Sequence, residues 1–155
     1  MVVPPQLLLG LGFSPEQLDC AGVKLTLCEV YNFGDSGEVL PESKRIPLYL
    51  ELKPNDSGMF ILEKGAYLVR YCEYVKVPED SMALAFPRSS LLRSGVTLFT
   101  AVWDPGYEGR GYGLMLVLNK HGIKIGVRAQ VAQLVYVKLS EKSAIPYRGA
   151  YHLER

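Results

Sequence analysis

The strongest constraint on the fold is a regular alternation of side chains over residues 66–77. One face of an extended chain would carry Tyr67, Val69, Tyr71 and Val75. The other face would carry Leu68, Arg70, Cys72, Tyr74 and Lys76. Because successive side chains point to opposite faces of a strand, this pattern predicts a β-strand. Pro78 and the turn that follows it are expected to end the strand.

The rest of the chain repeats this kind of element in shorter form. Apolar and β-branched runs separated by Gly, Pro, Asp and Ser turns occupy residues 23–28, 46–53, 59–62, 82–86, 96–103, 112–118 and part of 127–139. Helix-start signals occur only before short segments, as at Ser14-Pro15-Glu16-Gln17, and residues 1–22 otherwise read as irregular. Short strands joined by such turns predict an all-β sandwich or barrel with one or two short helices.

Length, charge and hydropathy narrow the class of protein. The 155 residues, 48% of them apolar, are expected to form a single domain with its own core. A net charge of +1 gives no electrostatic case for nucleic-acid binding. No apolar run reaches about 18 residues, and the N-terminus carries Pro4-Pro5 and no basic segment, so neither a membrane span nor a signal peptide is expected.

The three cysteines are Cys20, Cys28 and Cys72. They are odd in number and not clustered, which is typical neither of a disulfide framework nor of a zinc site. They fit a reducing compartment, and we therefore expect a cytoplasmic protein.

A first polar cluster lies in residues 87–95, PRSSLLRSG. Arg88 and Arg93 offer cations suited to phosphate oxygens. Ser89 or Ser90 is expected to cap a short helix through residues 91–94, with free backbone N–H groups directed at an anion. The alternative is a capped surface turn with two solvated arginines.

A second cluster, WDPGYEG, follows the apolar run at residues 96–103. Asp104 would stand at a strand end, where a carboxylate can orient and deprotonate a water. Tyr107 could stack on a sugar or base, and the glycines up to Gly113 would let a backbone approach a ligand. The alternative is an Asx-type turn with Tyr107 packed over it.

Two further segments could join these clusters. Gln133 stands inside an apolar run, where its amide must find hydrogen-bond partners in a ligand pocket or in water. The tail from about residue 140 is polar, contains Tyr147 and Tyr151, and is expected to be mobile unless it docks.

Taken together, these motifs resemble the superfamily of trimeric dUTP diphosphatases and dCTP deaminases, with an archaeal dUTPase-like character. The pattern R-S-S-L-x-R at residues 88–93 is similar to its second motif, D-x-G-Y-x-G at 104–109 to its third, and A-Q-L at 132–134 to its fourth. Residues 146–152 resemble the tail segment Y-x-G-x-Y-Q.

The resemblance implies a distorted jelly-roll or β-clip barrel and a homotrimer with sites between subunits. It implies hydrolysis of dUTP to dUMP and pyrophosphate, with Mg²⁺ held mainly by substrate phosphates and water and no protein metal-ligand cluster. Asp104 would direct water at the α-phosphorus, and Tyr107 would exclude a ribose 2′-hydroxyl. The phosphates would meet Arg88, Ser89, Ser90 and Arg93.

The same resemblance implies which residues would contact the base and which would close over the bound nucleotide. Backbone groups of Gly113, Leu114 and Leu116 would read the base edge, Gln133 would face the pocket, and Tyr147 or Tyr151 would close it.

Departures from the family pattern keep other functions open. Lys24 replaces the acid of the first motif, and Gln130 stands where the fourth motif often has Arg, which motivates a non-catalytic nucleotide-binding paralog. A dCTP deaminase or a bifunctional enzyme would need a glutamate at Leu114 or Leu116. Neither can carry a proton, so we expect no deamination.

Overall fold

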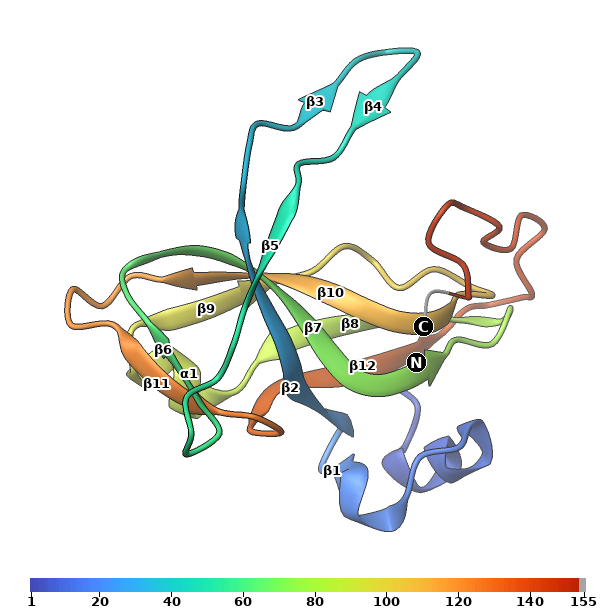
Figure 1. The fold of residues 1–155 in the computed structure, drawn as a ribbon. Coiled ribbons are helices and arrows are strands. Elements are labelled where there is room, and N and C mark those ends of the chain that lie inside the picture. Colours follow the sequence, from blue (N-terminus) through green and yellow to red (C-terminus); the bar gives the residue numbers. More distant parts are fainter. Residues whose placement is uncertain (154–155) are drawn as a thin grey trace.

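The alternating segment forms the long strand β7, Gly65–Lys76, in the middle of the main sheet (Figure 1). The structure is a computed structural model that describes residues 1–153. The predicted strand is confirmed, and Tyr67, Val69, Tyr71 and Val75 are at most 8% exposed, so the face that they share is the buried one.

The main sheet has eight strands, in the order β8-β12-β2-β7-β10-β9, with β1 and β5 also paired to β2. All the pairs are antiparallel. The other strands are β1 Leu18–Asp19, β2 Gly22–Phe33, β5 Tyr49–Leu52, β8 Ser81–Pro87, β9 Val96–Phe99, β10 Glu108–Val117 and β12 Gln130–Lys138.

The two edges of this sheet curl toward each other. Edge strand β8 meets the segment that follows edge strand β9 through an isolated bridge between Ala83 and Trp103, whose backbone groups bond in both directions at 3.0 and 2.9 Å. The sheet is therefore a nearly closed barrel around one apolar core, and the predicted all-β fold is confirmed.

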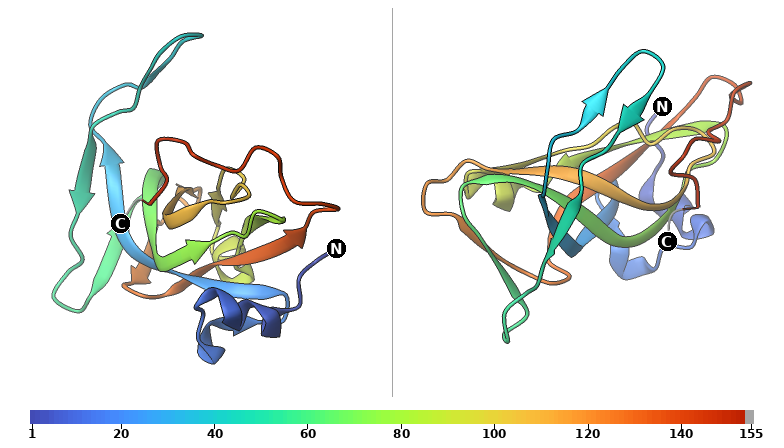
Figure 2. Two further views of the ribbon diagram at one scale, coloured as in Figure 1. Left: turned by 90° about the vertical axis from the view of Figure 1, so that its right-hand side faces the viewer. Right: turned by 45° about the horizontal axis from the view of Figure 1, so that its top comes forward.

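Two small sheets extend the barrel. Strands β6, Met59–Leu62, and β11, Ile123–Gly126, pair with each other, and β11 was not predicted. Strands β3, Glu38–Val39, and β4, Lys44–Arg45, form a hairpin that projects away from the barrel (Figures 1 and 2). We call residues 34–48 the arm.

The helices are short. The expected helix start at Ser14 opens the 3₁₀ helix η2, Pro15–Gln17, with a capping box in which Ser14 N–H donates to Gln17 Oε1 at 2.8 Å. A 3₁₀ helix η1, Pro5–Leu11, occupies the segment expected to be irregular, because Leu8 packs into the core. Helix α1, Ser89–Arg93, is the third. No helix in the described part of the chain is long and apolar enough to cross a membrane.

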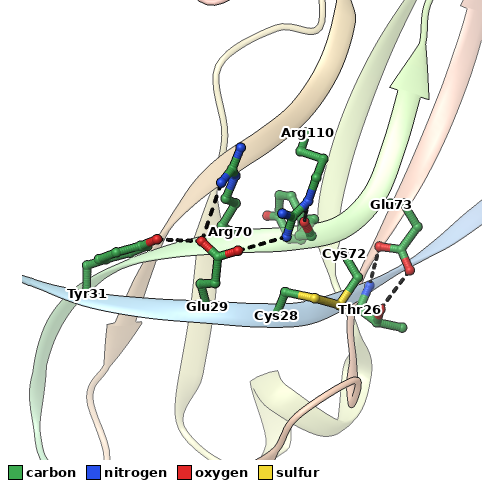
Figure 3. Close-up of a disulfide and its surroundings, with 9 residues drawn as sticks. Thr26, Cys28, Glu29, Tyr31, Arg70, Cys72, Glu73 and Arg110 are labelled. Atoms are coloured by element: carbon green, nitrogen blue, oxygen red, sulfur yellow. Dashed lines mark hydrogen bonds and ion pairs between the residues drawn. A yellow bond between two sulfur atoms is a disulfide. The ribbon is translucent and has the colours of Figure 1, made fainter. Parts of the chain in front are cut away.

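The expectation that the cysteines form no disulfide is wrong for two of them. Cys28 on β2 and Cys72 on β7 are bonded, with their Cα atoms 4.9 Å apart, while Cys20 is free and exposed (Figure 3). These cysteines are 44 residues apart in the sequence and meet only because β2 and β7 are neighbours in the sheet. The spacing of the cysteines in the sequence does not by itself predict which residues of β2 and β7 lie opposite each other.

Candidate active site

The site begins where the β9–β10 hairpin opens. These strands pair from Val96–Val117 to Phe99–Leu114, and the chain then leaves the ladder over residues 100–102 before Trp103 bridges to Ala83. The separation of the two strands leaves space beside β10. Residues on both sides of this opening, among them Ala101 and Gly111, line a cavity.

Asp104 stands at the mouth of this opening on a turn held by backbone bonds. Tyr107 N donates to Asp104 O at 3.0 Å, and Gly106 N donates to Val77 O at 2.9 Å. In return, Val77 N donates to Tyr107 O at 2.8 Å. The Asp104 carboxyl is exposed, and since the turn does not depend on it, the group is available for chemistry.

Aromatic rings form the floor of the opening. The Trp103 ring lies edge-on to the Tyr107 ring with centroids 5.3 Å apart, and it packs on Tyr71 at 6.1 Å. A Cβ added at Gly111 would lie 2.2 Å from the Trp103 ring, and one at Gly113 would lie 2.4 Å from Tyr71 Oη. Glycine at both positions is therefore a packing requirement of this floor.

The C-terminal tail docks on the same turn of its own chain. Tyr147 N donates to Pro105 O at 2.7 Å, and Leu153 N donates to Glu108 O at 2.7 Å. The Tyr147 ring packs against Tyr107 with centroids 5.7 Å apart. The tail thus runs from β12 back across the hairpin turn (Figure 2, left). Its mobility in solution stays a prediction.

These elements surround a cavity of about 540 Å³, a size suited to a small-molecule ligand. The hairpin contributes Ala101, Val102, Trp103, Asp104, Tyr107, Gly111 and Tyr112. The arm, β5 and β7 contribute Lys44, Ile46, Tyr49 and Leu68, and the tail contributes Tyr147, Gly149, Ala150 and Tyr151. The structure therefore brings together four of the predicted site residues: Asp104, Tyr107, Tyr147 and Tyr151.

Comparisons with known proteins identify the family of the chain. A family model described as dCTP deaminase-like matches residues 9–139. The chain is 39% identical over 149 residues to a protein of Aeropyrum pernix named probable deoxyuridine 5'-triphosphate nucleotidohydrolase, covering 95% of this chain and 93% of the relative. A deoxyuridine 5'-triphosphate nucleotidohydrolase of Methanocaldococcus jannaschii is 37% identical, over 88% of this chain and 87% of its own.

The chain belongs to the dCTP deaminase-like family. Among solved structures, the 2'-deoxycytidine 5'-triphosphate deaminase from Agrobacterium tumefaciens superposes with a TM-score of 0.65 at 20% sequence identity. The match covers 87% of this chain and 47% of that one, and at this identity it shows a shared fold. The family recognised from the motifs is thereby confirmed.

The family's arginine–serine motif lies outside the cavity. Helix α1 begins at Ser89, so Arg88 holds the cap position and neither Ser89 nor Ser90 caps the helix as expected. No side-chain cap bond is found for this helix, and Ser89, Ser90 and Arg93 are exposed. Because α1 begins two residues before the expected helix at residues 91–94, both serines fall inside its first turn.

Arg88 forms a hydrogen-bonded ion pair with Asp19. The hydrogen bond from Arg88 is the main cause that lowers the pKa of the Asp19 carboxyl, with help from the Cys20 N–H. Asp19 was not singled out in the sequence, since nothing local marks a partner 69 residues from Arg88.

The fourth motif lies on β12, next to Arg88. Gln133 Nε2 donates to Ala21 O at 2.8 Å, so this amide bonds to backbone within its own chain. Lys24, which replaces the family acid, donates from Nζ to Glu16 O at 3.0 Å, and Gln130 is exposed. Neither departure lies among the residues that line the cavity.

The residues assigned to base recognition fall on β10. Leu114 and Leu116 pair with β7 on one side and with β9 on the other, and neither lines the cavity. Gly113 lies just beyond the last β9 pair, at the start of the opening. The backbone that borders the cavity is thus nearer Gly111 than Leu116.

A charged cluster on the outer face of the sheet was missed by sequence reasoning (Figure 3). Glu29 pairs with Arg110 at 3.1 Å and with Arg70 at 3.5 Å, and it accepts a hydrogen bond from Tyr31. Burial would raise the pKa of Glu29, but the Tyr31 hydrogen bond and the two guanidinium charges lower it overall. Arg70 also lies 5.2 Å from the centroid of the Tyr112 ring, behind the cavity wall.

Proposed function

We propose that this protein is a dUTP diphosphatase that hydrolyses dUTP to dUMP and pyrophosphate. The observation that carries the proposal is the exposed Asp104 carboxyl at the mouth of a nucleotide-sized cavity, with Tyr107 beside it. The printed names of the Aeropyrum and Methanocaldococcus relatives support the same reaction.

In this proposal Asp104 acts as the general base. A water held by its carboxylate attacks the α-phosphorus of dUTP, and Asp104 accepts the proton that this water loses. The bond from the α-phosphorus to its bridging oxygen breaks, and pyrophosphate leaves with that oxygen. Positioning and charge neutralisation supply most of the catalysis in such phosphoryl transfers.

The cavity suits a deoxynucleoside. Tyr107 is half-buried between Trp103 and Tyr147, so its ring is held in place and can pack closely beneath a sugar. We assign recognition of the base edge to the backbone where the hairpin opens, from Gly111 to Gly113, because the ladder on both sides occupies Leu114 and Leu116.

The proposed cofactor is Mg²⁺. Among the described residues that line the cavity, Asp104 is the single carboxylate, and residues 1–153 contain no group of three His, Cys, Asp or Glu placed to hold a metal. This donor set fits Mg²⁺, which proteins commonly bind through one or two carboxylates together with substrate phosphates and water. The ion would supply charge neutralisation at the triphosphate.

The proposed assembly is a homotrimer whose sites lie between subunits. Lys44 is the one cation among the described residues that line the cavity with Asp104, and Arg88, Ser89, Ser90 and Arg93 do not line it. For these four residues to meet a triphosphate seated there, they would have to come from another subunit. A second copy of this chain could bring its α1 to the cavity. Cytoplasmic location stays a prediction, and since Cys28 and Cys72 are bonded, the cysteines no longer argue for it.

Deamination of dCTP is the second candidate, favoured by the family to which the chain belongs. Water attack on a cytosine ring needs a group that moves protons at the base, and Leu114 and Leu116 cannot supply one. The remaining acid, Glu108, pairs with Lys76 at 3.1 Å, and the hydrogen bond from Lys76 lowers its pKa. Glu108 is thus an ionised, paired carboxylate on the hairpin turn.

A substrate panel tests these functions. Purified protein with Mg²⁺ should release pyrophosphate from dUTP in preference to dCTP, dTTP and UTP, and it should release no ammonia from dCTP. Ammonia release that survives Glu108→Gln would contradict the assignment to the hydrolase branch. Tight binding of a non-hydrolysable dUTP analogue without turnover of dUTP would instead identify a non-catalytic binding protein.

A further inference from the structure

The arm and the tail meet at the edge of the cavity, although they come from opposite halves of the chain. Lys44 and Ile46 of the arm line it, and so do Tyr147, Gly149 and Tyr151 of the tail. Neither Lys44 nor Ile46 is among the site residues predicted from the sequence. In the folded chain the arm is a wall of the proposed site.

The contact between arm and tail is a cation–π interaction. Lys44 Nζ lies 5.1 Å from the centroid of the Tyr151 ring. An ammonium within about 6 Å of a ring centroid is attracted by the ring's negative face. Lys44 is exposed and Tyr151 is 41% exposed, so this contact is of the solvent-exposed, moderate kind.

The arm is braced so that Lys44 is held toward the tail. Arg45, its neighbour in sequence, pairs with Asp35 at 2.8 Å and donates to Ser36 O at 2.7 Å. Asp35 also accepts the Leu48 N–H at 2.7 Å, which ties the two ends of the arm together. Side chains alternate along β4, so Lys44 points away from this internal network.

Tyr151 lies between two fixed points of the tail. Tyr147 is anchored to Pro105 and Leu153 to Glu108 by backbone bonds, while Tyr151 N donates to Tyr147 Oη at 3.3 Å. The Tyr151 ring itself is free to turn toward solvent unless something holds it. Loss of Lys44 would therefore loosen the ring and the amides around it, while the two anchors stay.

We propose that Lys44 is a positioning residue, whose ammonium holds the Tyr151 ring at the cavity edge and so keeps the tail closed over a bound nucleotide. The nucleotide part rests on the proposed function, while the contact between arm and tail does not. Lys44 and Asp104 are the two charged side chains among the described lining residues. Direct binding of substrate phosphate by Lys44 is therefore the competing role that an experiment must separate.

The first measurement uses no nucleotide. Hydrogen exchange at the amides of Tyr151 and His152 is followed by mass spectrometry in the full-length protein and in Lys44→Met, Lys44→Arg, Tyr151→Leu and Tyr151→Phe. Exchange should be about two- to fivefold faster in Lys44→Met and Tyr151→Leu, the scale of an exposed cation–π contact. Lys44→Arg and Tyr151→Phe keep cation and ring and should match the wild type. Lys124→Met, on the exposed face of β11, is the matched control.

The second measurement uses a non-hydrolysable dUTP analogue. Trp103 is the only tryptophan of the chain and lines the cavity, so its fluorescence can report binding. Lys44→Met and Tyr151→Leu should each raise Kd, and the KM for dUTP, by about two- to fivefold with kcat unchanged. The double variant should be no worse than either single one, because both remove the same contact.

Two results would overturn the proposal. Unchanged exchange in Lys44→Met would show that Lys44 does not hold the tail. Additive effects of the two substitutions on Kd would show that Lys44 acts on the nucleotide directly. If the wild type neither binds the analogue nor hydrolyses dUTP, the proposed function fails, and the exchange measurement still decides the contact between arm and tail.

Discussion

The cavity around Asp104 and the surface around Arg88 hold the two halves of the proposed chemistry, and the chain builds them differently. Asp104 stands on a turn fixed by backbone bonds to the end of β7, over a floor of packed rings. Arg88 stands at the start of a five-residue helix and is held by one carboxylate, Asp19.

The two regions differ in whether one chain by itself encloses them. The Asp104 region is closed by the tail and the arm of its own chain, and its geometry rests on main-chain bonds and glycine contacts. The Arg88 region is an open surface on which the charge of Arg88 is neutralised by Asp19 of the same chain. Under the proposed function, the first region would hold the base and sugar, and the second would bind a phosphate.

The largest expected effect comes from Asp104→Asn. The turn bonds use the backbone of residue 104, so the fold should persist, as circular dichroism can check. Turnover of dUTP should fall by about 10²–10⁴, the usual scale for a lost general base. Asp56→Asn, on an exposed turn far from the cavity, serves as control. A folded Asp104→Asn enzyme with normal turnover would remove this residue from the mechanism.

Arg88→Ala tests the other region. If Arg88 neutralises phosphate, kcat/KM for dUTP should fall by about ten- to a hundredfold, as expected for a lost hydrogen bond to a charged group. Arg88→Lys keeps the charge but loses the planar pair of donors, so it should recover only part of the activity. Steady-state kinetics that leave Arg88→Ala equal to the wild type would break the assignment of this surface to the phosphates.

Mixing the two variants tests whether the regions meet across a subunit boundary. Asp104→Asn and Arg88→Ala are each poorly active, but random trimers of the two contain intact sites at about a quarter of their interfaces. After the mixture is unfolded and refolded together, dUTP turnover per site should rise to about that level. No recovery in confirmed mixed trimers would place both residues in one subunit's site, and a monomer by light scattering at micromolar concentration would refute the trimer.

The smallest effect concerns the ion pair itself. The pKa of Asp19 is lowered in the folded state, so the carboxylate stabilises the fold above its unfolded pKa of about 3.9 and loses that effect as the pH falls through the folded value. Asp19→Asn should therefore lower the free energy of unfolding at pH 7 by about 1 kcal/mol or less, with the difference vanishing near pH 2.

Urea unfolding of both proteins at several pH values measures this difference. A gap that widens toward acid would contradict the assigned direction of the pKa. It would also show that Arg88 is held by something other than the Asp19 carboxylate.

Local sequence patterns predicted the elements well wherever burial follows a simple period. The alternation over residues 66–77 gave β7, and Met59–Leu62 was predicted with the bounds it has. Helix η1 was not predicted, because the Pro and Leu residues at its start show no periodic pattern. Its stability comes from Leu8, which is buried in the core. The predicted grouping of Asp104, Tyr107, Tyr147 and Tyr151 came from motif order, not from spacing.

The sequence by itself determined an all-β chain, its family and the residues with the right chemistry, because these depend on side-chain identity and on order along one strand or turn. The tertiary structure decided the Cys28–Cys72 bond, the Arg88–Asp19 pair, the meeting of Lys44 with Tyr151 and the separation of Arg88 from Asp104. Each of these joins, or keeps apart, segments distant in sequence. Such contacts depend on strand register and sheet curvature, which are set by how the whole core packs and not by any local pattern.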